Sequence, residues 1–529
     1  MAPTAAPSRP ALWAKVIDQT RCIGCHACTI ACKSENAVPL SVTRTYVKYV
    51  DVGEFPHARR AFQVTRCNQC DDAPCTAACP TGAMFRRADG IVDFDKSICI
   101  GCKACIAACP YDAIFINPED HSAEKCNFCA HRLDLGLEPA CVVVCPTEAI
   151  FVGDLNDATS RVAQIVNREP VTVRRPEKGT RPKLFYRGAH QATLDPLAAR
   201  RPDGGLYMWS EQPAGSSIVP AGHQGRERAA AANANGAGAA RATSSPFNSS
   251  AAALLSYDVA HRRPWDWRVG LYTWTKSIAA GAYLAALLLS VFGAAAWDGA
   301  LWRVAAPVLG GAALALTGLI LILDLEHPTR FHLIFTRPQW RSWLVRGAFI
   351  IAAYAALLVV HFVLGGLGAT TALRSLAPIG ALLAVATAAY TAYLFAQAKA
   401  RDLWQNPLAP PHLVVQALLA GAAVLAPVAA AFEPAALAPM LLLLALACAT
   451  HLLFVIGELT LTHPTAHAHA AARELVRGRY GFFFWAGMLL VAAGALAPWI
   501  GAWAAVPALA GLLAYEHAYV QAGQAVPLA

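Results

Sequence analysis

Long hydrophobic runs occupy only the second half of this 529-residue chain. From Trp267 onward the runs lack the polar face of a soluble helix, and each approaches the ~20 residues that cross a bilayer. The pattern predicts eight transmembrane helices, at residues 269–296, 304–324, 344–368, 376–397, 412–432, 438–459, 481–498 and 502–520. Only a turn around Pro498–Gly501 separates the last two.

The first half shows shorter elements. Gly90–Asp95 alternates between apolar and polar residues and predicts a strand. Residues 156–209 form a polar extension with several prolines, and residues 210–253 are mainly Ala, Gly, Ser, Asn and Pro, a composition that favours a flexible linker. A short Ala-rich helix at 228–232 is the alternative there. The predicted domains are 1–209, a linker at 210–263, and a transmembrane domain at 264–529.

Composition sharpens the contrast between the two halves. The chain is 56% hydrophobic and 15% charged. Residues 1–263 carry 30 basic and 25 acidic side chains, whereas residues 264–529 carry 13 and 9. Sixteen of the 17 cysteines lie between Cys22 and Cys145. This distribution excludes a single soluble enzyme and a disulfide-stapled secreted scaffold. The net charge of +9 comes with no lysine-rich tract, so nucleic acid is not an expected partner.

The loops between the predicted helices indicate orientation. Thirteen Lys and Arg residues lie on the side shared with the cysteine-rich half, and only Arg303 and Arg374 lie on the opposite side. Positive charge marks the cytoplasmic side of a membrane protein. Met1–Pro10 also lacks the basic and apolar regions of a secretory signal. We therefore expect a multi-pass protein of the bacterial inner (cytoplasmic) membrane, with its cysteine-rich half in the cytoplasm.

A short repeat divides the predicted helices into two sets of four. An acidic residue followed by His-Pro-Thr comes after the second helix (Asp324 to Thr329) and again after the sixth (Glu458 to Thr465). Because four is an even number, such a repeat would be parallel, with its axis along the membrane normal. Chance similarity of so short a match is the alternative.

Four cysteine motifs define the chemistry of the first half. They are Cys22-x2-Cys25-x2-Cys28-x3-Cys32, Cys67-x2-Cys70-x4-Cys75-x3-Cys79-Pro80, Cys99-x2-Cys102-x2-Cys105-x3-Cys109-Pro110 and Cys126-x2-Cys129-x11-Cys141-x3-Cys145-Pro146. In such runs three cysteines hold one [4Fe–4S] cube and the fourth ligates another. Sixteen cysteines therefore suit four cubes. An apolar triplet follows each Cys-Pro pair and predicts a short strand over each cluster.

Zinc and disulfides are the alternatives for these cysteines. Paired Cys-x2-Cys motifs also bind structural zinc. Zinc does not require a third cysteine two residues later and a fourth three residues after that, repeated with Cys-Pro endings. Disulfides are unusual in a domain that faces the cytoplasm. The motifs therefore favour iron–sulfur clusters.

At this point the first half, over residues 11–190, resembles the four-cluster ferredoxin subunits of molybdopterin oxidoreductases such as dimethyl sulfoxide and polysulfide reductases. The resemblance implies an α+β ferredoxin-like fold and joins the first motif with the fourth and the second with the third. The implied cubes are Cys22/Cys25/Cys28/Cys145, Cys126/Cys129/Cys141/Cys32, Cys67/Cys70/Cys75/Cys109 and Cys99/Cys102/Cys105/Cys79. One departure from the family pattern is Lys33, which stands where Pro follows the other final cysteines.

The second half resembles the NrfD/polysulfide-reductase membrane subunits, which exchange electrons with quinone. The similarity rests on Tyr272–Tyr283 in the first predicted helix and on Asp324–Phe331 after the second. Lys276-Ser277 and Glu326-His327 depart from the family pattern, so the family's quinone geometry does not transfer directly. The resemblance implies an all-α bundle of about eight helices, two four-helix sets, with quinone or quinol as bound substrate.

Ionisable residues inside the membrane are costly and usually functional. They gather at the end of the predicted bundle nearest the cysteine-rich half. Candidates for quinone binding and proton transfer are Tyr272, Lys276, Asp324, His327, His451 and Glu458. Snorkelling or interhelical ion pairing is the structural alternative for each. His361 and His451 also raise the possibility of haem, although no pair on facing helices is evident.

These features together lead to a functional hypothesis. The chain contains no molybdopterin or primary-substrate site, so the resemblance implies a separate molybdopterin-type catalytic subunit. The chain would pass electrons between that partner and membrane quinone through four [4Fe–4S] clusters. Sulfite is the favoured electron donor by resemblance, followed by formate. The alternatives are a proton-translocating redox module, and a passive membrane anchor for a ferredoxin domain.

Overall fold

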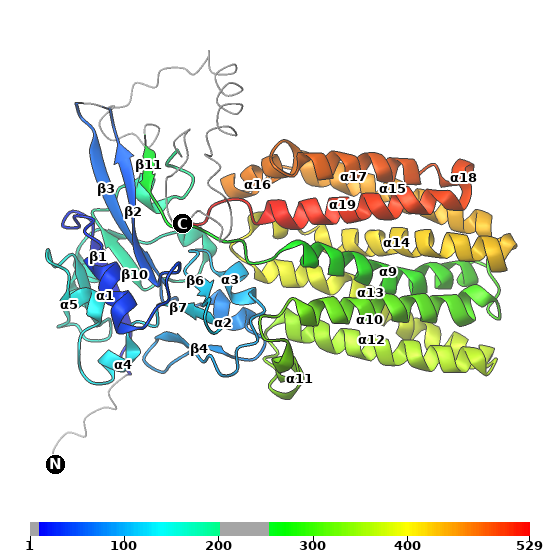
Figure 1. Cartoon of the computed structure of the whole chain (residues 1–529), viewed down its shortest axis with the longest axis horizontal. Coiled ribbons are helices and arrows are strands. Elements are labelled where there is room, and N and C mark those ends of the chain that lie inside the picture. The colour runs from blue at the N-terminus through cyan, green and yellow to red at the C-terminus, as the bar shows by residue number, and fades with distance from the viewer. Residues whose placement is uncertain (1–9, 55, 201–252) are drawn as a thin grey trace.

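The computed structural model describes residues 10–54, 56–200 and 253–529. Two parts lie end to end (Figure 1). The first, here called the cysteine domain, comprises residues 10–200 and is built from small sheets and short helices. The second, the helical domain, comprises residues 267–523 and is built from long helices running roughly parallel to one another.

A four-stranded sheet forms the base of the cysteine domain, with the order β8 (Ile150–Asp154), β1 (Trp13–Asp18), β10 (Leu184–Arg187) and β9 (Val171–Thr172). β1 runs parallel to β10 and antiparallel to β8. Alternate residues of a strand face opposite sides of a sheet. Val16 therefore packs with residues of α6 (Arg161–Arg168), whereas Ile17 packs with the cysteine-bearing segments.

Three antiparallel hairpins complete the strands of this domain. They pair β2 (Thr45–Val52) with β3 (Arg59–Arg66), β4 (Met84–Arg86) with β5 (Val92–Phe94), and β6 (Ile114–Ile116) with β7 (Ala123–Lys125). The strand predicted within Gly90–Asp95 is β5, and the triplets after the three Cys-Pro pairs lie in β4, β6 and β8. These predictions are confirmed.

Short helices carry five of the sixteen cysteines, namely Cys28, Cys32, Cys75, Cys105 and Cys141. The short helices are α1 (Ala27–Glu35), α2 (Pro74–Ala78), α3 (Ala104–Ala108), α4 (Ala130–Leu133) and α5 (Ala140–Val143), with α7 (Gln191–Leu194) near the end of the domain. α1 packs against α5 and α2 packs against α3. The first motif therefore lies beside the fourth, and the second beside the third.

The segment entering the helical domain folds onto the cysteine domain. The predicted linker extended to Arg263, and residues 210–252 of it, including the alternative helix at 228–232, lie outside the described residues. Leu254–Tyr257 forms β11, which pairs antiparallel with β2 and makes β2 the central strand of a three-stranded sheet. An Ala-rich composition gave no signal for this strand, because its partner β2 lies some 200 residues earlier in the chain.

Within the part of the chain that the structure describes, seven helices are long and apolar enough to cross a membrane. In chain order these are α9 (Trp267–Val291), α10 (Ala306–Leu323, extended by a π-turn at Leu301–Ala305), α12 (Trp343–Gly366), α13 (Thr370–Gln397), α14 (Ala409–Phe432), α15 (Pro434–Thr460) and α19 (Ala505–Gly523, continued from Ala497). α11 (Leu333–Thr336) and α16 (Ala466–Val476) lie in the connecting loops.

An eighth apolar helix is shorter than a full membrane span. α17 (Gly481–Gly494) has 14 residues and is followed by the four-residue α18 (Ala497–Ile500), which contains Pro498. The predicted seventh helix thus breaks just after Gly494, where proline removes a backbone donor. The structure supports about seven apolar spans, and a count of eight remains a prediction.

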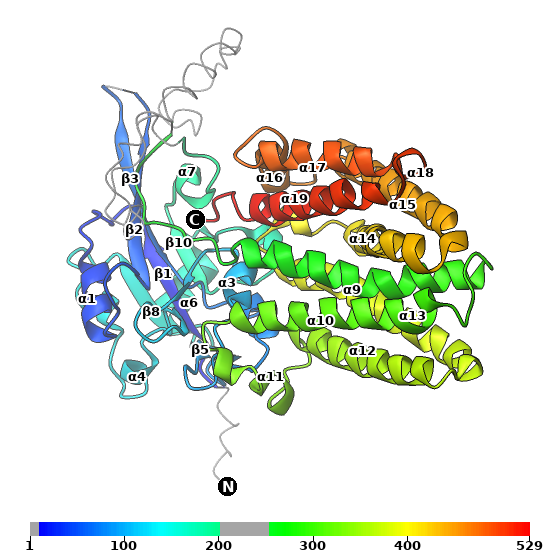
Figure 2. The same ribbon diagram turned by 45° about the vertical axis from the view of Figure 1, so that its right-hand side comes forward.

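α9 lies at the centre of the helical domain and packs against α10, α13, α14 and α19 (Figure 2). It crosses α14 where Gly281 faces Gly421, and a Cβ on either glycine would collide with the backbone of the other helix. These two glycines are 140 positions apart in the sequence. This close crossing joins the first helix of one predicted four-helix set to the first helix of the other.

The C-terminus of the chain lies between the two domains (Figure 1). Arg174 of the cysteine domain donates a hydrogen bond to the carbonyl of Leu528, and Arg401 of the helical domain donates to the carbonyls of Gln524 and Val526. Both arginines are buried. The C-terminal segment therefore holds the two domains together.

Candidate iron–sulfur and quinone sites

The thiols of the cysteine domain converge in four sets. Three of these sets each line a separate cavity, and they are Cys22/Cys25/Cys28/Cys145, Cys67/Cys70/Cys75/Cys109 and Cys79/Cys99/Cys102/Cys105. In the fourth set, Cys32 lies within electrostatic reach of Cys126, Cys129 and Cys141. Asn36 links two of its members, with its side-chain nitrogen 3.7 Å from the sulfur of Cys32 and 3.8 Å from that of Cys129. These are the four sets that the family resemblance implied.

The backbone repeats the same conformation in all four motifs. The residue just before each second cysteine has a positive φ: Gly24 at 71°, Gln69 at 48°, Gly101 at 70° and Phe128 at 68°. Only glycine adopts this left-handed backbone conformation at low energetic cost. Gln69 and Phe128 are therefore held in it by their surroundings. A common turn at a common place brings successive thiols toward one centre.

The donor chemistry fits an iron–sulfur cube. Backbone N–H groups of Met84, Ala123 and Ala149 donate to the sulfurs of Cys79, Cys99 and Cys145 at 3.4, 3.4 and 3.2 Å. Such bonds stabilise thiolates and tune the clusters that thiolates bind. Among the described residues, no group of three or more His, Cys, Asp or Glu side chains is arranged to hold a single metal ion. Three of the sets instead surround a cavity with four thiols.

One set has a strongly positive environment. The buried guanidinium of Arg66 donates a 2.9 Å hydrogen bond to the sulfur of Cys141, and the ammonium of Lys15 lies 3.8 Å from the same sulfur. Burial by itself would raise the pKa of the Cys141 thiol, but these two cations lower it to about 7. The pKa of Cys32, in the same set, is raised to about 12 by burial. The charge on this set is therefore stabilised chiefly at Cys141.

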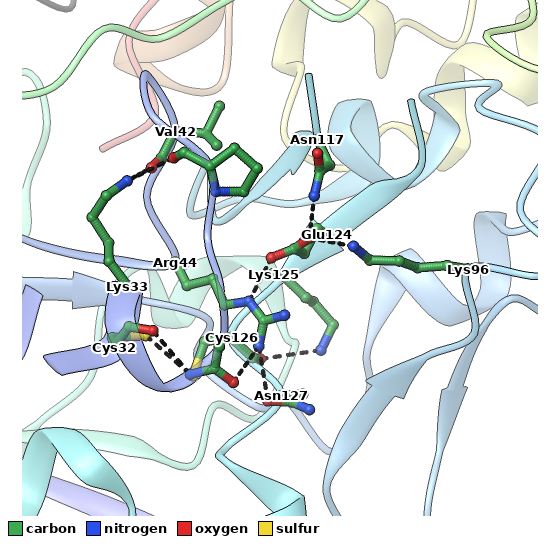
Figure 3. Close-up of polar contacts among 12 residues, drawn as sticks. Cys32, Lys33, Val42, Arg44, Lys96, Asn117, Glu124, Lys125, Cys126 and Asn127 are labelled. Atoms are coloured by element: carbon green, nitrogen blue, oxygen red, sulfur yellow. Dashed lines mark hydrogen bonds and ion pairs between the residues drawn. The ribbon is translucent and has the colours of Figure 1, made fainter. Parts of the chain in front are cut away.

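A buried ion-pair network holds the first and fourth motifs together (Figure 3). Glu124, which is 1% exposed, accepts from Arg44 at 2.7 Å and pairs with Lys96 at 2.7 Å. Arg44 also donates to the side chains of Asn36 and Asn127. Asn36 follows the helix of the first motif and Asn127 lies within the fourth. This network fixes Cys32 relative to Cys126 and Cys129.

The four sets follow one another through the domain. Cys28 lies within electrostatic reach of Cys141, Cys67 of Cys126, and Cys105 of Cys75. Each of these pairs joins two different sets. At one end of the series Cys25 is exposed to solvent. At the other end the set containing Cys102 meets the helical domain.

The junction at Cys102 is closely packed. Trp265 donates to the carbonyl of Cys102 at 3.3 Å, and Arg330 donates to the carbonyl of Cys99 at 2.9 Å. A Cβ on Gly101 would collide with the side chain of Glu326. Ala107, between Cys105 and Cys109, shares a hydrophobic cluster with Tyr272 of α9. Little space therefore separates the last thiol set from the helical domain.

The predicted quinone residues separate into two neighbouring groups and one interface pair. Tyr272 and Lys276 lie on α9 and face α13. The ammonium of Lys276 is wholly buried and donates to the hydroxyl of Thr391 at 2.6 Å and to the carbonyl of Ala388 at 2.8 Å. The same ammonium lies 4.9 Å from the ring centre of Tyr390. This group is here called the α9–α13 site.

His451 and Glu458 belong to a second group, between α14, α15 and α19. His412 bonds to Glu458 at 2.9 Å and to His451 at 2.8 Å, and Tyr515 donates to Glu458 at 3.0 Å. Gln416 lies 3.3 Å from His412. All members of this group except His451 line a cavity of about 30 Å³, together with Thr273 and Glu516. The group is here called the α14–α19 cluster.

Asp324 and His327 lie at the junction with the cysteine domain. A carboxylate oxygen of Asp324 is 3.9 Å from the ammonium of Lys103, and the ring of His327 is 3.3 Å from the hydroxyl of Ser122. Sequence reasoning did not single out Thr391, Tyr390 or Tyr515. No motif or charge pattern within α13 or α19 indicates that these residues belong to a site.

Comparison with known proteins agrees with this architecture. A family model for a 4Fe-4S dicluster domain matches residues 59–155, and a model for the polysulphide reductase NrfD matches residues 257–511. The B subunit of tetrathionate reductase from Salmonella typhimurium is 42% identical over 207 residues, which cover 38% of this chain and 80% of that protein. The B component of polysulfide reductase from Wolinella succinogenes is 43% identical over 171 residues, or 32% of this chain and 90% of that protein. Protein NrfC of Escherichia coli is 44% identical over 173 residues, which cover 32% of this chain and 78% of that protein.

The protein belongs to the family of iron–sulfur subunits that includes the B components of tetrathionate reductase and polysulfide reductase, and its second half is an NrfD membrane domain. Its cysteine domain is therefore an iron–sulfur cluster domain of the 4Fe-4S type. Its NrfD domain, with seven long apolar helices, makes it a multi-pass membrane protein. A single polypeptide thus combines the two functional units.

Proposed function

We propose that this protein is the electron-transfer and membrane-anchoring subunit of an oxidoreductase complex, and that it connects a catalytic partner to membrane quinone. The observation that carries this proposal is the series of four thiol sets, which begins at the exposed Cys25 and ends with Cys102 beside α9. Clusters held in such a series could receive electrons at the exposed set that contains Cys25 and deliver them at the set that contains Cys102, beside the helical domain.

Each thiol set is proposed to hold one [4Fe–4S] cluster, with the ligands grouped as in the four sets above. Bound clusters of this type supply one-electron transfer over a range of potentials set by nearby charge and hydrogen bonding. The protein contributes the thiolates, the N–H groups that point at their sulfurs, and the cations Arg66 and Lys15.

The α9–α13 site is the proposed place of quinone reaction. Tyr272, Lys276 and Thr391 supply hydrogen-bonding groups within apolar helices, as a quinone ring with two carbonyl oxygens requires. Asp324 acts electrostatically on both Cys102 and Tyr272, and His327 contacts Ser122 of the cysteine domain. His451 and Glu458, also candidates from the sequence, lie on the other side of α9 and are proposed to serve it as proton carriers.

The proposed partner is a molybdopterin-type catalytic subunit that docks around Cys25. The proposed docking patch consists of four exposed apolar residues: Ile23 and Ile30, near this cysteine in the sequence, and Val143 and Val144, in and beside α5, which packs against α1. Contiguous exposed apolar surface marks an interaction site on a soluble domain. Relatives are named for tetrathionate, polysulfide and selenate reductases, and these names do not point to sulfite or formate. Oxidation of either donor therefore remains a prediction from resemblance.

The proposed location is the bacterial inner membrane with the cysteine domain in the cytoplasm. The support is the excess of basic residues in loops on the side of the cysteine domain. Arg268, Arg330, Arg337 and Arg341 all lie in or beside those loops. A protease added to right-side-out spheroplasts tests this placement, because it should cleave the cysteine domain only after the membrane is opened.

Co-purification tests the partner. The full-length protein, tagged and solubilised, should bring with it a molybdopterin-containing subunit that mass spectrometry can identify. Ile23→Glu combined with Val143→Glu should abolish this association while the iron content is retained. Phe85→Glu, an exposed apolar residue on β4, is the matched control. Association that survives the double substitution would exclude this patch as the docking surface.

A further inference from the structure

The two four-helix sets place polar groups at corresponding positions. Tyr272 and Lys276 of α9 correspond, 140 positions later, to His412 and Gln416 of α14. The same offset relates Gly281 to Gly421, which meet at the helix crossing. Tyr390 and Thr391 of α13 likewise correspond to Tyr515 and Glu516 of α19, 125 positions later. The α14–α19 cluster is therefore the counterpart of the α9–α13 site.

Packing supports this correspondence independently. A Cβ on Gly347 of α12 would collide with the ring of Tyr390, and a Cβ on Gly487 of α17 would lie 3.0 Å from the backbone nitrogen of Tyr515. Gly347 and Gly487 are again 140 positions apart. Small residues permit such close approach between membrane helices. In each set, a glycine of the third helix (α12 or α17) therefore allows close packing of the fourth helix (α13 or α19) at its tyrosine.

The chemistry of the two sites has diverged. The α9–α13 site offers one ammonium and several hydroxyls. The α14–α19 cluster offers side chains that exchange protons, namely His412, His451, Glu458 and Glu516. We infer that the α14–α19 cluster is a proton relay for the quinone site, and that it is not a second quinone site. This inference rests on the proposed quinone function of the α9–α13 site.

A continuous set of hydrogen bonds forms most of the relay. Glu458 is bonded to His412 at 2.9 Å and to Tyr515 at 3.0 Å, and His412 is bonded to His451 at 2.8 Å. Glu458 lies two residues before the end of α15, on the side of the cysteine domain, and its side chain is 10% exposed. Glu458 is therefore the point at which a proton can enter from solvent.

The cavity at the centre has the size and lining of a water site. Its volume of about 30 Å³ exceeds the ~10–15 Å³ that one water requires and is too small for a quinone ring. Two buried polar atoms on residues that line this cavity have no protein partner: Oε1 of Gln416 and Oε1 of Glu516. Water in the cavity would satisfy such atoms and continue the series of hydrogen bonds toward Glu516.

Glu516 connects the cluster to α9. Its carboxylate accepts from the hydroxyl of Thr273 at 2.9 Å and acts electrostatically on Lys276. Thr273 is adjacent to Tyr272 and almost one turn before Lys276. The charged and titratable groups around Glu516 are Tyr272 and Lys276 on α9, His412 on α14, Glu458 on α15, and Tyr515 and Tyr519 on α19.

The stoichiometry of quinone reduction determines how many protons the relay must supply. Reduction of one quinone to quinol consumes two electrons, which the cysteine domain supplies, and two protons. Glu516 passes a proton toward the α9–α13 site and recovers one through the cavity from His412 and Glu458. Glu458, where the proton enters, lies on the side of the cysteine domain, so the relay is proposed to supply protons for the chemistry and not to carry them across the membrane.

The test uses the full-length protein in nanodiscs with its clusters reduced by dithionite and a short-chain quinone added. Glu458→Gln and Glu516→Gln should each slow quinone reduction at least tenfold, with unchanged quinone affinity and a larger solvent isotope effect. Glu458→Asp should restore most of the rate. Glu474→Gln, an acid on α16 outside the cluster, is the matched control and should react like the parent protein.

Each result separates the relay from the quinone function. Parent-like rates in both glutamine variants would overturn the relay and leave the quinone function standing. Loss of quinone affinity in step with the rate would show that the α14–α19 cluster binds quinone itself, and would also overturn the relay. Failure of the parent protein to reduce quinone would overturn the proposed function, and the relay with it.

Discussion

Arg66 donates a 2.9 Å hydrogen bond to the sulfur of Cys141, and both side chains are buried. A buried cation beside a thiolate stabilises negative charge, which a cluster gains on reduction. The set that contains Cys141 also has Lys15 at 3.8 Å. This pair of cations distinguishes its environment from that of Cys102, which lies near the acidic Asp324.

The first prediction concerns the potential of this cluster. Arg66→Met should make the cluster proposed to be held by Cys32, Cys126, Cys129 and Cys141 harder to reduce, because it removes the positive charge at Cys141. We expect a fall of about 59 mV or more, a tenfold change in the ratio of reduced to oxidised cluster for one electron. Redox titration followed by electron paramagnetic resonance measures it. Arg60→Met, exposed on the same strand, is the control, and an unchanged midpoint in Arg66→Met would contradict the prediction.

The second prediction concerns the segment that joins the two domains. His261 is bonded to Asp112 at 2.5 Å and to Asp258 at 3.2 Å. Burial alone would lower the pKa of His261, but the two carboxylates raise it to about 9 from the usual 6.5. A folded-state pKa above the unfolded value gives stability that is complete below about pH 6.5 and is lost as the pH rises through about 9.

Thermal unfolding in detergent measures this effect. The parent protein should lose more stability between pH 7 and pH 10 than His261→Gln does. At pH 7, His261→Gln should itself be less stable by about 3 kcal/mol, because Asp112 and Asp258 keep buried charges without their partner. His332→Gln, on an exposed loop, should behave like the parent protein. Equal pH dependence in parent and variant would refute the role of His261.

The third prediction concerns the ligands next to the helical domain. Cys102→Ser should remove or convert one of the four clusters and lower the iron content by up to about a quarter, because each cube takes four thiolates. Cys448→Ser is the matched control, since Cys448 is buried in α15 outside every thiol set. Iron and acid-labile sulfide analysis of the two purified variants tests this prediction. Equal iron in the two variants would remove Cys102 from the ligands.

The fourth prediction concerns the α9–α13 site. Lys276→Met should lower kcat/KM for quinone at least tenfold, because it removes the ammonium that bonds to Thr391 and faces Tyr390. The loss should appear partly in KM, since Lys276 is proposed to contact the bound quinone. Ser290→Ala, a buried position near the other end of α9, should leave both constants unchanged. Quinone reduction at unaltered rates by Lys276→Met would place the site elsewhere.

The sequence predicted those features that depend on local spacing. Cysteine spacing fixes which thiols lie on a common turn, so Cys22, Cys25 and Cys28 converge as expected. Long apolar runs give membrane helices irrespective of their neighbours. Alternation likewise predicted β5, and the Cys-Pro endings predicted the strands after them.

Features that depend on tertiary packing could not be predicted in this way. Thr391 meets Lys276 only because α13 packs on α9, and nothing in the sequence around Thr391 indicates that contact. The residues chosen as one quinone site fall on both sides of α9, because distance along the chain does not reveal which helices are neighbours. Gly494 and Pro498 broke one predicted span that hydropathy alone treated as continuous.

Reoxidation of the clusters by quinone tests the central claim most directly. The full-length protein is purified in nanodiscs, its clusters are reduced with dithionite, excess reductant is removed, and a short-chain quinone is mixed in while cluster absorbance is followed. We predict that all four clusters are reoxidised, two electrons for each quinol formed, and that Cys102→Ser interrupts this reaction while Cys448→Ser does not. Clusters that stay reduced in the parent protein while quinone is bound would contradict the account.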